Sequence, residues 1–486
     1  MCRIAVCVID PGSHFMQSWN TRFRALEINH LRSPAFAQPV AFEPTALVDF
    51  AVREGRTSEL IDAPVSGQWI ASTDVDKGAM LQSLPSSALF RDFCAELEAK
   101  LPHSWLSGAA TSVSKDASTG KFRVHYKATD DQRELAVEAS AVILATGPVG
   151  RWNIPSPFEP HLDSPRVLHT EELLVNCKGT LSEEITRRCP GESARVLVIG
   201  GGISAAQAAL AAFRAGHQVV LRSRRPLHTA PFDVGPEWLD MRTADRVRFE
   251  FLCLPMKRRG MAVHDATPGG SVPANYMEEL VHYAAESPDM LRLEVDKGID
   301  CSQVCVGRDG VIVVNGDSFA MVILATGVVT GPSCSPIFQS VKELFDAPVV
   351  GGLPRVDSRL RWAPGEDLFV LGANAVLELG PGGGNLMGSM RGARVVSNEL
   401  RSLMGKQAPA RASCSTTVRN QYACLGDRVR FGDGEDAEVC RACRGWIAML
   451  ASCCIALHPV FIPSLTPFPS PSAPPNRSTS LRSSST

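Results

Sequence analysis

The sequence predicts an α/β protein of two large strand–helix units, one of them discontinuous because the other is inserted into it. Three observations predict this architecture. An apolar strand ending in a Thr-Gly turn occurs twice, at 141–147 and at 321–327. Each copy follows strand-like segments that indicate a β-meander crossover. Between the copies, residues 195–221 have the order strand, glycine turn, helix and second strand, which is the order of a β-α-β unit.

The composition is that of a soluble globular protein with more than one domain. A chain of 486 residues is too long for one hydrophobic core, and 44% of its residues are apolar. The net charge of −2 gives no overall attraction to nucleic acid, and we expect none as a partner. The first ten residues lack the apolar stretch of a secretory signal, and most cysteines outside the tail are scattered singly. We therefore expect a cytoplasmic protein.

The repeated segment is a buried strand that ends in a tight turn. Its copies are Ala-Val-Ile-Leu-Ala-Thr-Gly and Met-Val-Ile-Leu-Ala-Thr-Gly. The second copy follows a strand-like run that ends in Asn315-Gly316, a strong two-residue hairpin signal. The first follows 122–126 and a polar loop at Asp130-Asp131. The copies lie much farther apart than the roughly 20–50 residues of a solenoid repeat, so they predict two α/β units.

Gly200, Gly202 and Ala205 form a Gly-x-Gly-x-x-Ala pattern between a strand and a helix. In a Rossmann unit the first glycine makes the tight turn, and the second lets the backbone approach a pyrophosphate. The third small residue lets the helix pack on the strand. The N–H groups and dipole of the helix N-terminus favour the phosphates. Since all the elements appear in order, the pattern favours dinucleotide binding over a chance glycine loop.

Basic residues follow the second strand of this unit. An NAD site has an acidic residue there, which binds the ribose 2′-hydroxyl. This chain has Arg222, Arg224 and Arg225 instead. Guanidinium groups can bind a 2′-phosphate bidentately, so the sequence predicts NADP. The alternative is a solvated basic turn.

Residues 4–10 resemble the second strand of another dinucleotide-binding unit, with Asp10 placed to bind an adenosine ribose. Only nine residues precede Asp10, whereas the first strand, glycine loop and helix of a complete unit need about thirty. We therefore expect an FAD-type unit whose phosphate loop is missing and whose sheet has an uncovered flank. The alternative is that 4–10 is simply an N-terminal strand.

Residues 367–400 have the features of the C-terminal part of such an FAD unit. A strand at 367–371 runs into Gly372-Ala373-Asn374, and a glycine-rich stretch at 378–388 leads into a helix. The N-terminus of a helix behind a glycine loop can meet the flavin. The alternative is a flexible glycine loop.

With these segments in order, the sequence resembles the class B flavoprotein monooxygenases over about residues 4–400. The resemblance is strongest to the lysine and ornithine N-monooxygenase branch. It is carried by the Asp10-Pro-Gly and Trp19 segment, Leu31-Arg-Ser-Pro34, Leu89-Phe-Arg-Asp-Phe93, the two Ala-Thr-Gly turns, the Gly200 pattern and 372–388. The resemblance implies that FAD is faced by Asp10, Thr146, Gly147, Gly372 and Asn374, and NADPH by Gly200, Gly202, Ala205, Arg222 and Arg224.

The sequence departs from this family at three places. The FAD glycine loop is absent, and the Phe-x-Gly-x-x-x-His fingerprint is not found, because Phe158 and His169 have a different spacing. Ala373-Asn374 replaces the aspartate that follows the last strand's glycine in many flavoproteins.

The resemblance implies a function as well as a fold. NADPH would reduce FAD, and the reduced flavin would activate O₂ to oxygenate a small amine or another heteroatom of a small metabolite. Since the cofactor carries the chemistry, no catalytic residue and no metal site are predicted. The rival hypothesis is a non-catalytic relative, similar to the oxidative stress-induced growth inhibitor proteins, or an inactive truncated gene product.

The predicted domains are an N-terminally truncated FAD-binding domain at 1–150, an NADP-binding domain at 151–330, the C-terminal part of the FAD-binding domain at 331–404, and a low-order tail at 405–486. Cys440 and Cys443 form a single C-x-x-C pair, from which we expect no zinc or redox site. The apolar run at 446–457 is shorter than the roughly twenty residues of a bilayer span, so we expect no membrane contact through 446–465.

Overall fold

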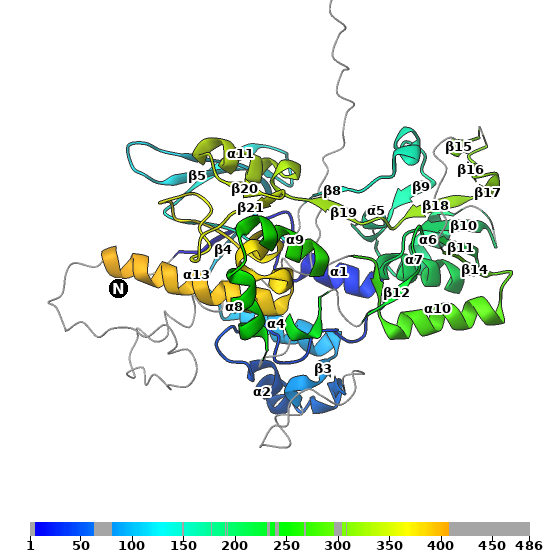
Figure 1. Ribbon diagram of the computed structural model, residues 1–486, viewed down its shortest axis with the longest axis horizontal. Coiled ribbons are helices and arrows are strands. Elements are labelled where there is room, and N and C mark those ends of the chain that lie inside the picture. Colours follow the sequence, from blue (N-terminus) through cyan, green and yellow to red (C-terminus); the bar gives the residue numbers. More distant parts are fainter. Residues whose placement is uncertain are drawn as a thin grey trace, which may run out of the picture.

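The computed structural model of the protein describes residues 5–62, 80–147 and 150–407, apart from short gaps at 176, 190, 192, 231–233, 239–242, 267–268, 296–303 and 308. The described residues form two units that lie side by side (Figure 1). The predicted α/β class is confirmed. The tail from residue 408 onward, including Cys440, Cys443 and 446–465, lies outside the described residues.

The right-hand unit in Figure 1 is built on a five-stranded parallel sheet. Its strands in spatial order are β14 (Leu291–Glu294), β11 (Gln218–Arg222), β10 (Arg195–Ile199), β18 (Met321–Leu324) and β9 (Val167–His169). One face is covered by α6 (Leu181–Arg188), α7 (Ile203–Arg214) and α10 (Ala274–Glu286). The other face packs on Phe158 and on an antiparallel meander. Because both faces are buried, the central strands are continuous apolar runs.

The β10–α7–β11 segment is the predicted β-α-β crossover. β10 and β11 are parallel, with Arg195 opposite Gln218 and Ile199 opposite Arg222. The helix ends before Gly216, whose φ of +84° is a left-handed conformation that glycine adopts without strain. The prediction of consecutive strand, helix and strand is therefore confirmed.

The meander before β18 is also confirmed. It consists of β15 (Val304–Val306), β16 (Ile312–Val314) and β17 (Asp317–Phe319), all antiparallel. Asn315 and Gly316 join β16 to β17 with φ values of +53° and +85°. Two central residues with positive φ are characteristic of the type I′ hairpin turn, which explains the Asn-Gly signal.

Among the described residues, the core of the left-hand unit is built on two separate hydrogen-bonded sheets. The first has the order β1 (Cys7–Asp10), β4 (Ser104–Lys115), β5 (Phe122–Ala128) and β6 (Glu134–Ala139), in which only β1 and β4 are parallel. The second consists of the parallel strands β7 (Val142–Leu144) and β22 (Leu368–Val370). Helix α13 (Leu386–Gln407) joins the two parts of the core. Its Leu386 packs with the cluster around Val8, and its Met390 packs with the cluster around Leu144.

The further helices of this unit among the described residues are α1 (Gln17–Ala25), α2 (Ala46–Arg53), α4 (Ser87–Ala99), α8 (Ala244–Leu252), α9 (Met256–Ala266), α11 (Pro336–Phe345) and α12 (Val376–Leu379). The remaining short strands are β2 (Leu60–Ile61), β3 (Leu84–Pro85), β12 (His228–Thr229), β13 (Ser271–Val272), β20 (Val349–Val350) and β21 (Leu353–Pro354). In the part of the chain described above, no helix combines the length and the apolar character needed to cross a membrane.

Two antiparallel strands connect the units, β8 (Gly150–Trp152) and β19 (Val328–Thr330), in the upper middle of Figure 1. The Trp152 ring stacks on the buried His169 ring, with 5.3 Å between centroids and 9° between planes. A ring nitrogen of His169 lies 3.1 Å from the Gly327 carbonyl oxygen. His169 is therefore a packing residue of the connection between the units.

A buried ion pair also joins the units. Arg22 of α1 contacts Glu171 of α5 (Thr170–Val175) at 2.5 Å, and the two side chains are only 9% and 10% exposed. Ala25 packs beside them on Leu174 and Cys177. Charges at this depth are stable only while they are paired.

We predict that Glu171→Leu lowers the free energy of unfolding by about 3–5 kcal/mol, because it leaves the Arg22 guanidinium buried without this partner. The double variant Arg22→Leu with Glu171→Leu should recover part of that loss. Chemical denaturation of the single and double variants measures both effects. A double variant whose loss equals the sum of the two single losses would contradict the pairing.

Candidate functional site

The glycine turn after β10 requires glycine at its first position. Gly200 has a φ of +153° and donates its N–H to the Arg222 carbonyl oxygen at 3.0 Å. A Cβ at this position would lie 2.3 Å from the Ala325 carbonyl oxygen, far inside van der Waals contact. It would also lie 3.1 Å from the Cβ of Ala205, so only a small residue fits at 205. The structure thus packs the turn tightly between β18 and α7.

The N-terminus of α7 has no side-chain cap. Gly202 is its N-cap residue, and among the described residues no side chain accepts a hydrogen bond from the first turn. The carbonyl oxygen of Gly202 accepts from the Ala205 and Ala206 N–H groups. Uncapped N–H groups at a helix N-terminus attract phosphate. The site therefore has the local geometry that a pyrophosphate requires.

A second glycine pair lies beside this turn and was not predicted from the sequence. Gly269 and Gly270 have φ values of +71° and +76°. The Gly270 Cα lies 3.3 Å from the place where a Cβ of Gly202 would be. The Gly-Gly dipeptide signals a turn, but its position against the phosphate turn depends on the tertiary fold.

The end of β11 also lies against the glycine turn. The Ser223 hydroxyl oxygen would be 2.6 Å from a Cβ at Gly201, so the Ser223 side chain packs directly on the glycine turn. This hydroxyl donates to the Arg225 carbonyl oxygen at 2.7 Å and fixes the turn that follows the strand. The Arg224 and Arg225 side chains leave this turn exposed to solvent. Arg224 and Arg225 therefore directly follow the residue that packs on Gly201.

The structure places Arg222 differently from the prediction. Its side chain is buried, and its Nε donates to the Glu294 carboxylate at 2.8 Å. Arg222 lies opposite Glu294 in the β11–β14 register, and Asp317 lies 3.4 Å from the same guanidinium. Burial alone would raise the pKa of Glu294, but hydrogen bonds from Arg222 and Arg292 outweigh it and lower that pKa. Arg222 therefore stabilises the sheet edge and is not placed to face a nucleotide phosphate.

In the left-hand unit, the structure brings together two of the turns predicted to face FAD. Because β7 and β22 are parallel, the turns that follow them lie side by side. The buried Asn374 side chain donates to the Gly147 carbonyl oxygen at 2.9 Å. Gly147 and Gly372 have φ values of +66° and +69°, so both turns need glycine. The Thr146 hydroxyl lies 3.3 Å from the Gly147 carbonyl oxygen, within the same turn.

Asp10 lies at the end of β1, in the other sheet of this unit. Its carboxylate accepts the Gly12 N–H at 2.7 Å, and burial raises the pKa of Asp10. The Trp105 ring N–H donates to the Gly12 carbonyl oxygen at 2.7 Å and fixes the same turn. Asp10 is therefore the last residue of a strand, which is the position of the acidic residue that binds ribose in a Rossmann unit.

The described residues fit an FAD molecule only in part. The carboxylate of Asp10 suits a ribose, and the buried Gly147 and Gly372 turns lie close to one another. Among the described residues of this unit, no strand, glycine loop and helix correspond to 195–205. A pyrophosphate contact of that type is therefore not provided by this part of the structure.

We predict that Asn374→Asp lowers the free energy of unfolding by about 1–3 kcal/mol near neutral pH, since a carboxylate cannot donate to the Gly147 carbonyl oxygen. Burial would raise the folded-state pKa of the new carboxyl above its unfolded value. Its neutral form can donate, so the loss should shrink as pH falls. Thermal unfolding of both proteins at about pH 5 and about pH 8 measures this. A loss that is larger at the lower pH would contradict the assigned hydrogen bond.

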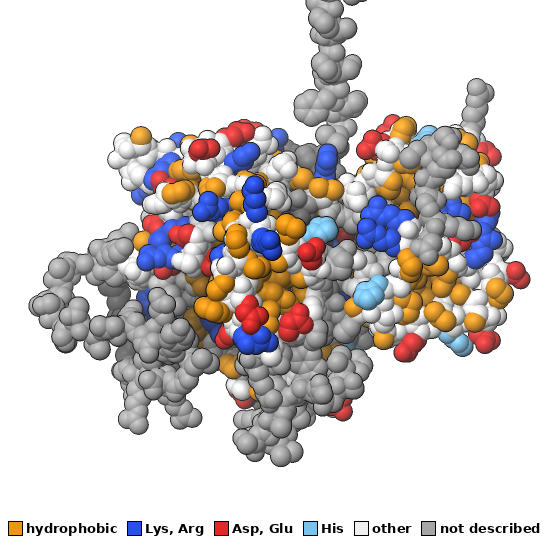
Figure 2. All heavy atoms as spheres, in the orientation of Figure 1, with side chains coloured by type: hydrophobic (Ala, Val, Ile, Leu, Met, Phe, Trp, Pro, Cys, Tyr) orange, Lys and Arg blue, Asp and Glu red, His pale blue; other side chains and the backbone are white. Residues whose placement is uncertain are grey.

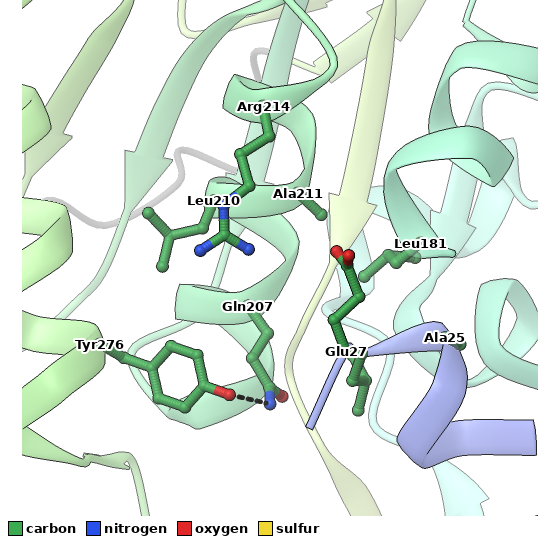
Figure 3. Close-up of a pocket in the computed structure, with 9 residues that line it drawn as sticks. Ala25, Glu27, Leu181, Gln207, Leu210, Ala211, Arg214 and Tyr276 are labelled. Atoms are coloured by element: carbon green, nitrogen blue, oxygen red, sulfur yellow. Dashed lines mark hydrogen bonds between the residues drawn. The ribbon is translucent and has the colours of Figure 1, made fainter. Parts of the chain in front are cut away.

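A small crevice between the units contains none of the predicted site residues. It is lined by the chain around Glu27, by α7 and by Tyr276. Figure 3 shows the Gln207 side chain hydrogen-bonded to the Tyr276 hydroxyl, at 3.2 Å, on the wall opposite Glu27. Across the described ranges, no three His, Cys, Asp or Glu side chains are grouped to hold a metal ion.

The two units and their turns define a class, the flavin-dependent oxidoreductase fold, in which two nucleotide-binding halves lie side by side. Residues 77–267 match the family described as pyridine nucleotide-disulphide oxidoreductase. No curated protein has significant sequence similarity to the chain.

Similar solved structures specify the fold further. The cadaverine monooxygenase of Erwinia amylovora, solved with FAD bound, is 16% identical with a TM-score of 0.58, covering 85% of this chain and 92% of that one. The ornithine hydroxylase of Pseudomonas aeruginosa is 14% identical, with a TM-score of 0.58 over 82% and 91% of the two chains. The ornithine N-hydroxylase of Kutzneria sp. 744, solved with reduced FAD, NADP⁺ and L-ornithine, is 15% identical, with a TM-score of 0.57 over 82% and 92%. The chain therefore has the fold of the N-hydroxylating flavin monooxygenases.

Proposed function

We propose that the protein is an NADPH-dependent, FAD-linked oxidoreductase that oxygenates the nitrogen of a small amine. One observation carries the proposal. Arg224 and Arg225 follow Ser223, whose side chain packs on Gly201, and Gly201 directly precedes the N-cap of α7, which has no side-chain cap. The chain shares its fold, over 85% of its length, with an amine monooxygenase.

In this proposal the NADPH pyrophosphate lies on the N–H groups at the start of α7, beside Gly200 and Gly202. Arg224 and Arg225 bind the 2′-phosphate through charge-assisted hydrogen bonds. Ala205 keeps the helix close to the strand. Arg222 positions the end of β11 through its ion pair with Glu294.

FAD would be held by Asp10 at its ribose and by the turns that contain Thr146, Gly147, Gly372 and Asn374. When bound, it supplies the hydride acceptor and the oxygen-activating centre. We assign 1–150 and 331–404 to the FAD-binding part and 151–330 to the NADP-binding part. In these parts the named residues bind and orient the two cofactors. We also propose that the protein works in the cytoplasm.

The purified chain tests the proposal directly. We expect it to carry or take up FAD, seen as flavin absorbance, and to oxidise NADPH in a reaction that consumes O₂. L-Ornithine, L-lysine or cadaverine, the substrates named for the similar structures, should stimulate that reaction and yield a hydroxylated amine. NADPH oxidation that releases only hydrogen peroxide with every amine would contradict the monooxygenase assignment.

A non-catalytic binding role is the second candidate. It is favoured by one observation, that the described residues of the FAD-binding part contain no glycine loop for a pyrophosphate. Such a protein would bind NADPH but take up no FAD when flavin is added in excess. Equilibrium dialysis with FAD distinguishes the two candidates.

A further inference from the structure

Two large apolar side chains on consecutive helices are unusually exposed. Phe249 of α8 is 67% exposed and Met261 of α9 is 63% exposed, the two highest values among the large apolar side chains of the described residues. Figure 2 shows apolar side chains gathered on the face where Figure 1 shows these two helices. We call the surface of α8 and α9 around Phe249 and Met261 the α8–α9 patch. Grouped apolar side chains on a protein surface mark a contact site.

Aromatic packing fixes the inner side of α8. Phe251 is buried, and its ring packs edge-on against Trp238, with 5.7 Å between the ring centroids. Residues two positions apart lie about 200° apart around a helix, so Phe249 points away from this contact. The helix is therefore held by one side, and the Phe249 ring on the other side is available to a further apolar group.

Helix α9 is poorly covered. None of its eleven residues, all of which the structure describes, is buried. The Arg259 guanidinium holds the helix in place by donating to the Leu252 and Leu377 carbonyl oxygens at 2.6 and 3.2 Å. Apolar side chains such as Met256 and Val263 are only partly buried. Because a helix of this length is marginal in water without apolar packing, further cover would stabilise α9.

The exposed charges around the α8–α9 patch balance. Besides His264, the two helices expose three acidic and three basic side chains, which are Asp245, Glu250, Asp265, Arg246, Lys257 and Arg258. The other two arginines of these helices, Arg248 and Arg259, are less exposed and lie beside Glu378. Attraction to an anionic membrane needs an excess of basic side chains at the surface, and the exposed side chains give none. The patch therefore fits an uncharged apolar segment better than it fits a membrane.

The chain contains such a segment outside the described residues. Residues 446–457 have the sequence Trp-Ile-Ala-Met-Leu-Ala-Ser-Cys-Cys-Ile-Ala-Leu, with no charged side chain. No other stretch of twelve residues within 408–486 lacks both charged residues and proline, apart from those that overlap it. Its tryptophan, methionine and aliphatic side chains are suited to pack on an exposed phenylalanine and methionine.

The position of α13 allows this segment to reach the patch. The start of α13 lies beside α8, where Arg391 is 3.8 Å from Asp245, and the helix ends at Gln407. With a rise of about 1.5 Å per residue, α13 carries the chain about 24 Å away from Arg391. Residues 408–445 span more than about 100 Å when fully extended, so 446–457 can return to α8 and α9. A linked segment competes at an effective concentration of about millimolar, well above that of most free partners.

We propose that residues 446–457 dock on the α8–α9 patch and cover Phe249 and Met261. The inference is independent of the proposed function, because it rests on exposure, charge and reach alone. The docked segment stabilises two helices that support the glycine-rich loop after Gly372. Trp238, which packs on α8, also lies against this loop, since a Cβ at Gly380 would be 2.4 Å from its ring.

Trypsin cleavage of the full chain after Arg444, two residues before the segment, tests the inference. The docked segment shields this bond, and mass spectrometry of the fragments follows its cleavage. Phe249→Asp combined with Met261→Asp should speed the cleavage about tenfold or more, because the apolar contacts are lost. Leu450→Asp combined with Ile455→Asp, in the segment itself, should have the same effect. Cleavage of both double variants at the wild-type rate would overturn the inference.

A matched control and a second measurement separate docking from local unfolding. Val281 of α10 is 54% exposed, so Val281→Asp introduces the same charge on another exposed apolar side chain and should leave the cleavage rate unchanged. Hydrogen exchange measures the contact from the other side. In the variant with Leu450→Asp and Ile455→Asp, whose α8 and α9 are unaltered, the amides of 256–266 should exchange about tenfold faster. Unchanged exchange there, or faster cleavage in Val281→Asp, would contradict docking on the patch.

Other occupants of the patch give different results. If the patch contacts a second copy of the chain, Phe249→Asp with Met261→Asp lowers the molar mass in sedimentation equilibrium and leaves the Arg444 cleavage unchanged. If it contacts lipid, the same variant loses binding to vesicles of phosphatidylserine and phosphatidylcholine, again with unchanged cleavage. Either result would overturn the proposal. Faster cleavage in both double variants, at the wild-type molar mass, supports it.

Discussion

Replacing Arg224 and Arg225 together with serine is expected to weaken NADPH binding about 100-fold and to leave NADH binding almost unchanged. Each guanidinium would lose a charge-assisted hydrogen bond to the 2′-phosphate, and about 1.4 kcal/mol for each corresponds to a factor of ten. NADH lacks this phosphate, so the two cofactors should become nearly equivalent. Fluorescence titration of both cofactors against the wild-type and variant chains measures the change.

The control for this variant is Arg246→Ser, which removes an exposed guanidinium on α8 that pairs with Glu250. It should not alter either affinity. If the double variant binds NADPH as tightly as the wild type does, the basic turn is only a solvated surface, and the NADP assignment loses its main support.

The second large effect is expected from Gly200→Ala. The new Cβ would lie 2.3 Å from the Ala325 carbonyl oxygen, on a residue with a φ of +153°. Relief requires β18 and β10 to move apart, and we expect a loss of about 2–4 kcal/mol of unfolding free energy. NADPH binding should be lost as well, because the turn no longer presents the start of α7. Chemical denaturation and cofactor titration measure the two effects separately.

Two other glycines serve as controls for Gly200→Ala. Gly216 has a φ of +84° with nothing within 4 Å of a new Cβ, so Gly216→Ala isolates the backbone strain at about 1 kcal/mol. Gly260 lies in α9 with open space and an ordinary φ, so Gly260→Ala should stabilise by up to about 1 kcal/mol. A Gly200→Ala variant no less stable than Gly216→Ala would contradict the close packing described for the turn.

The local patterns predicted the elements of the right-hand unit well. The β10–α7–β11 crossover follows from an apolar run, a glycine turn and an alanine-rich helix, which depend on residues close in sequence. The hairpin at Asn315-Gly316 is likewise a local turn preference, confirmed by the positive φ of both residues. The two Thr-Gly turns also end buried strands, as their repetition predicted.

Arg222 shows the limit of predicting a side chain's partner from the local sequence. A basic residue at the end of a strand suggests a phosphate ligand, but its partner depends on the strand that lies beside it. That strand is β14, and it places Glu294 directly opposite Arg222. Glu294 is 72 positions further along the chain, and nothing local to β11 indicates the pairing.

The same limit applies to the left-hand unit. The glycine-rich stretch predicted a turn at Gly372, but the hydrogen bond from Asn374 to Gly147 joins residues 227 positions apart.

The most direct test of the NADP assignment isolates the phosphate that distinguishes NADP from NAD. Calorimetric titration of the full chain with 2′,5′-ADP and with 5′-AMP compares two ligands that differ only in that group. We predict that 2′,5′-ADP binds at least about tenfold more tightly, and that the difference disappears when Arg224 and Arg225 are both serine. Equal binding of the two nucleotides to the wild-type chain would contradict the assignment.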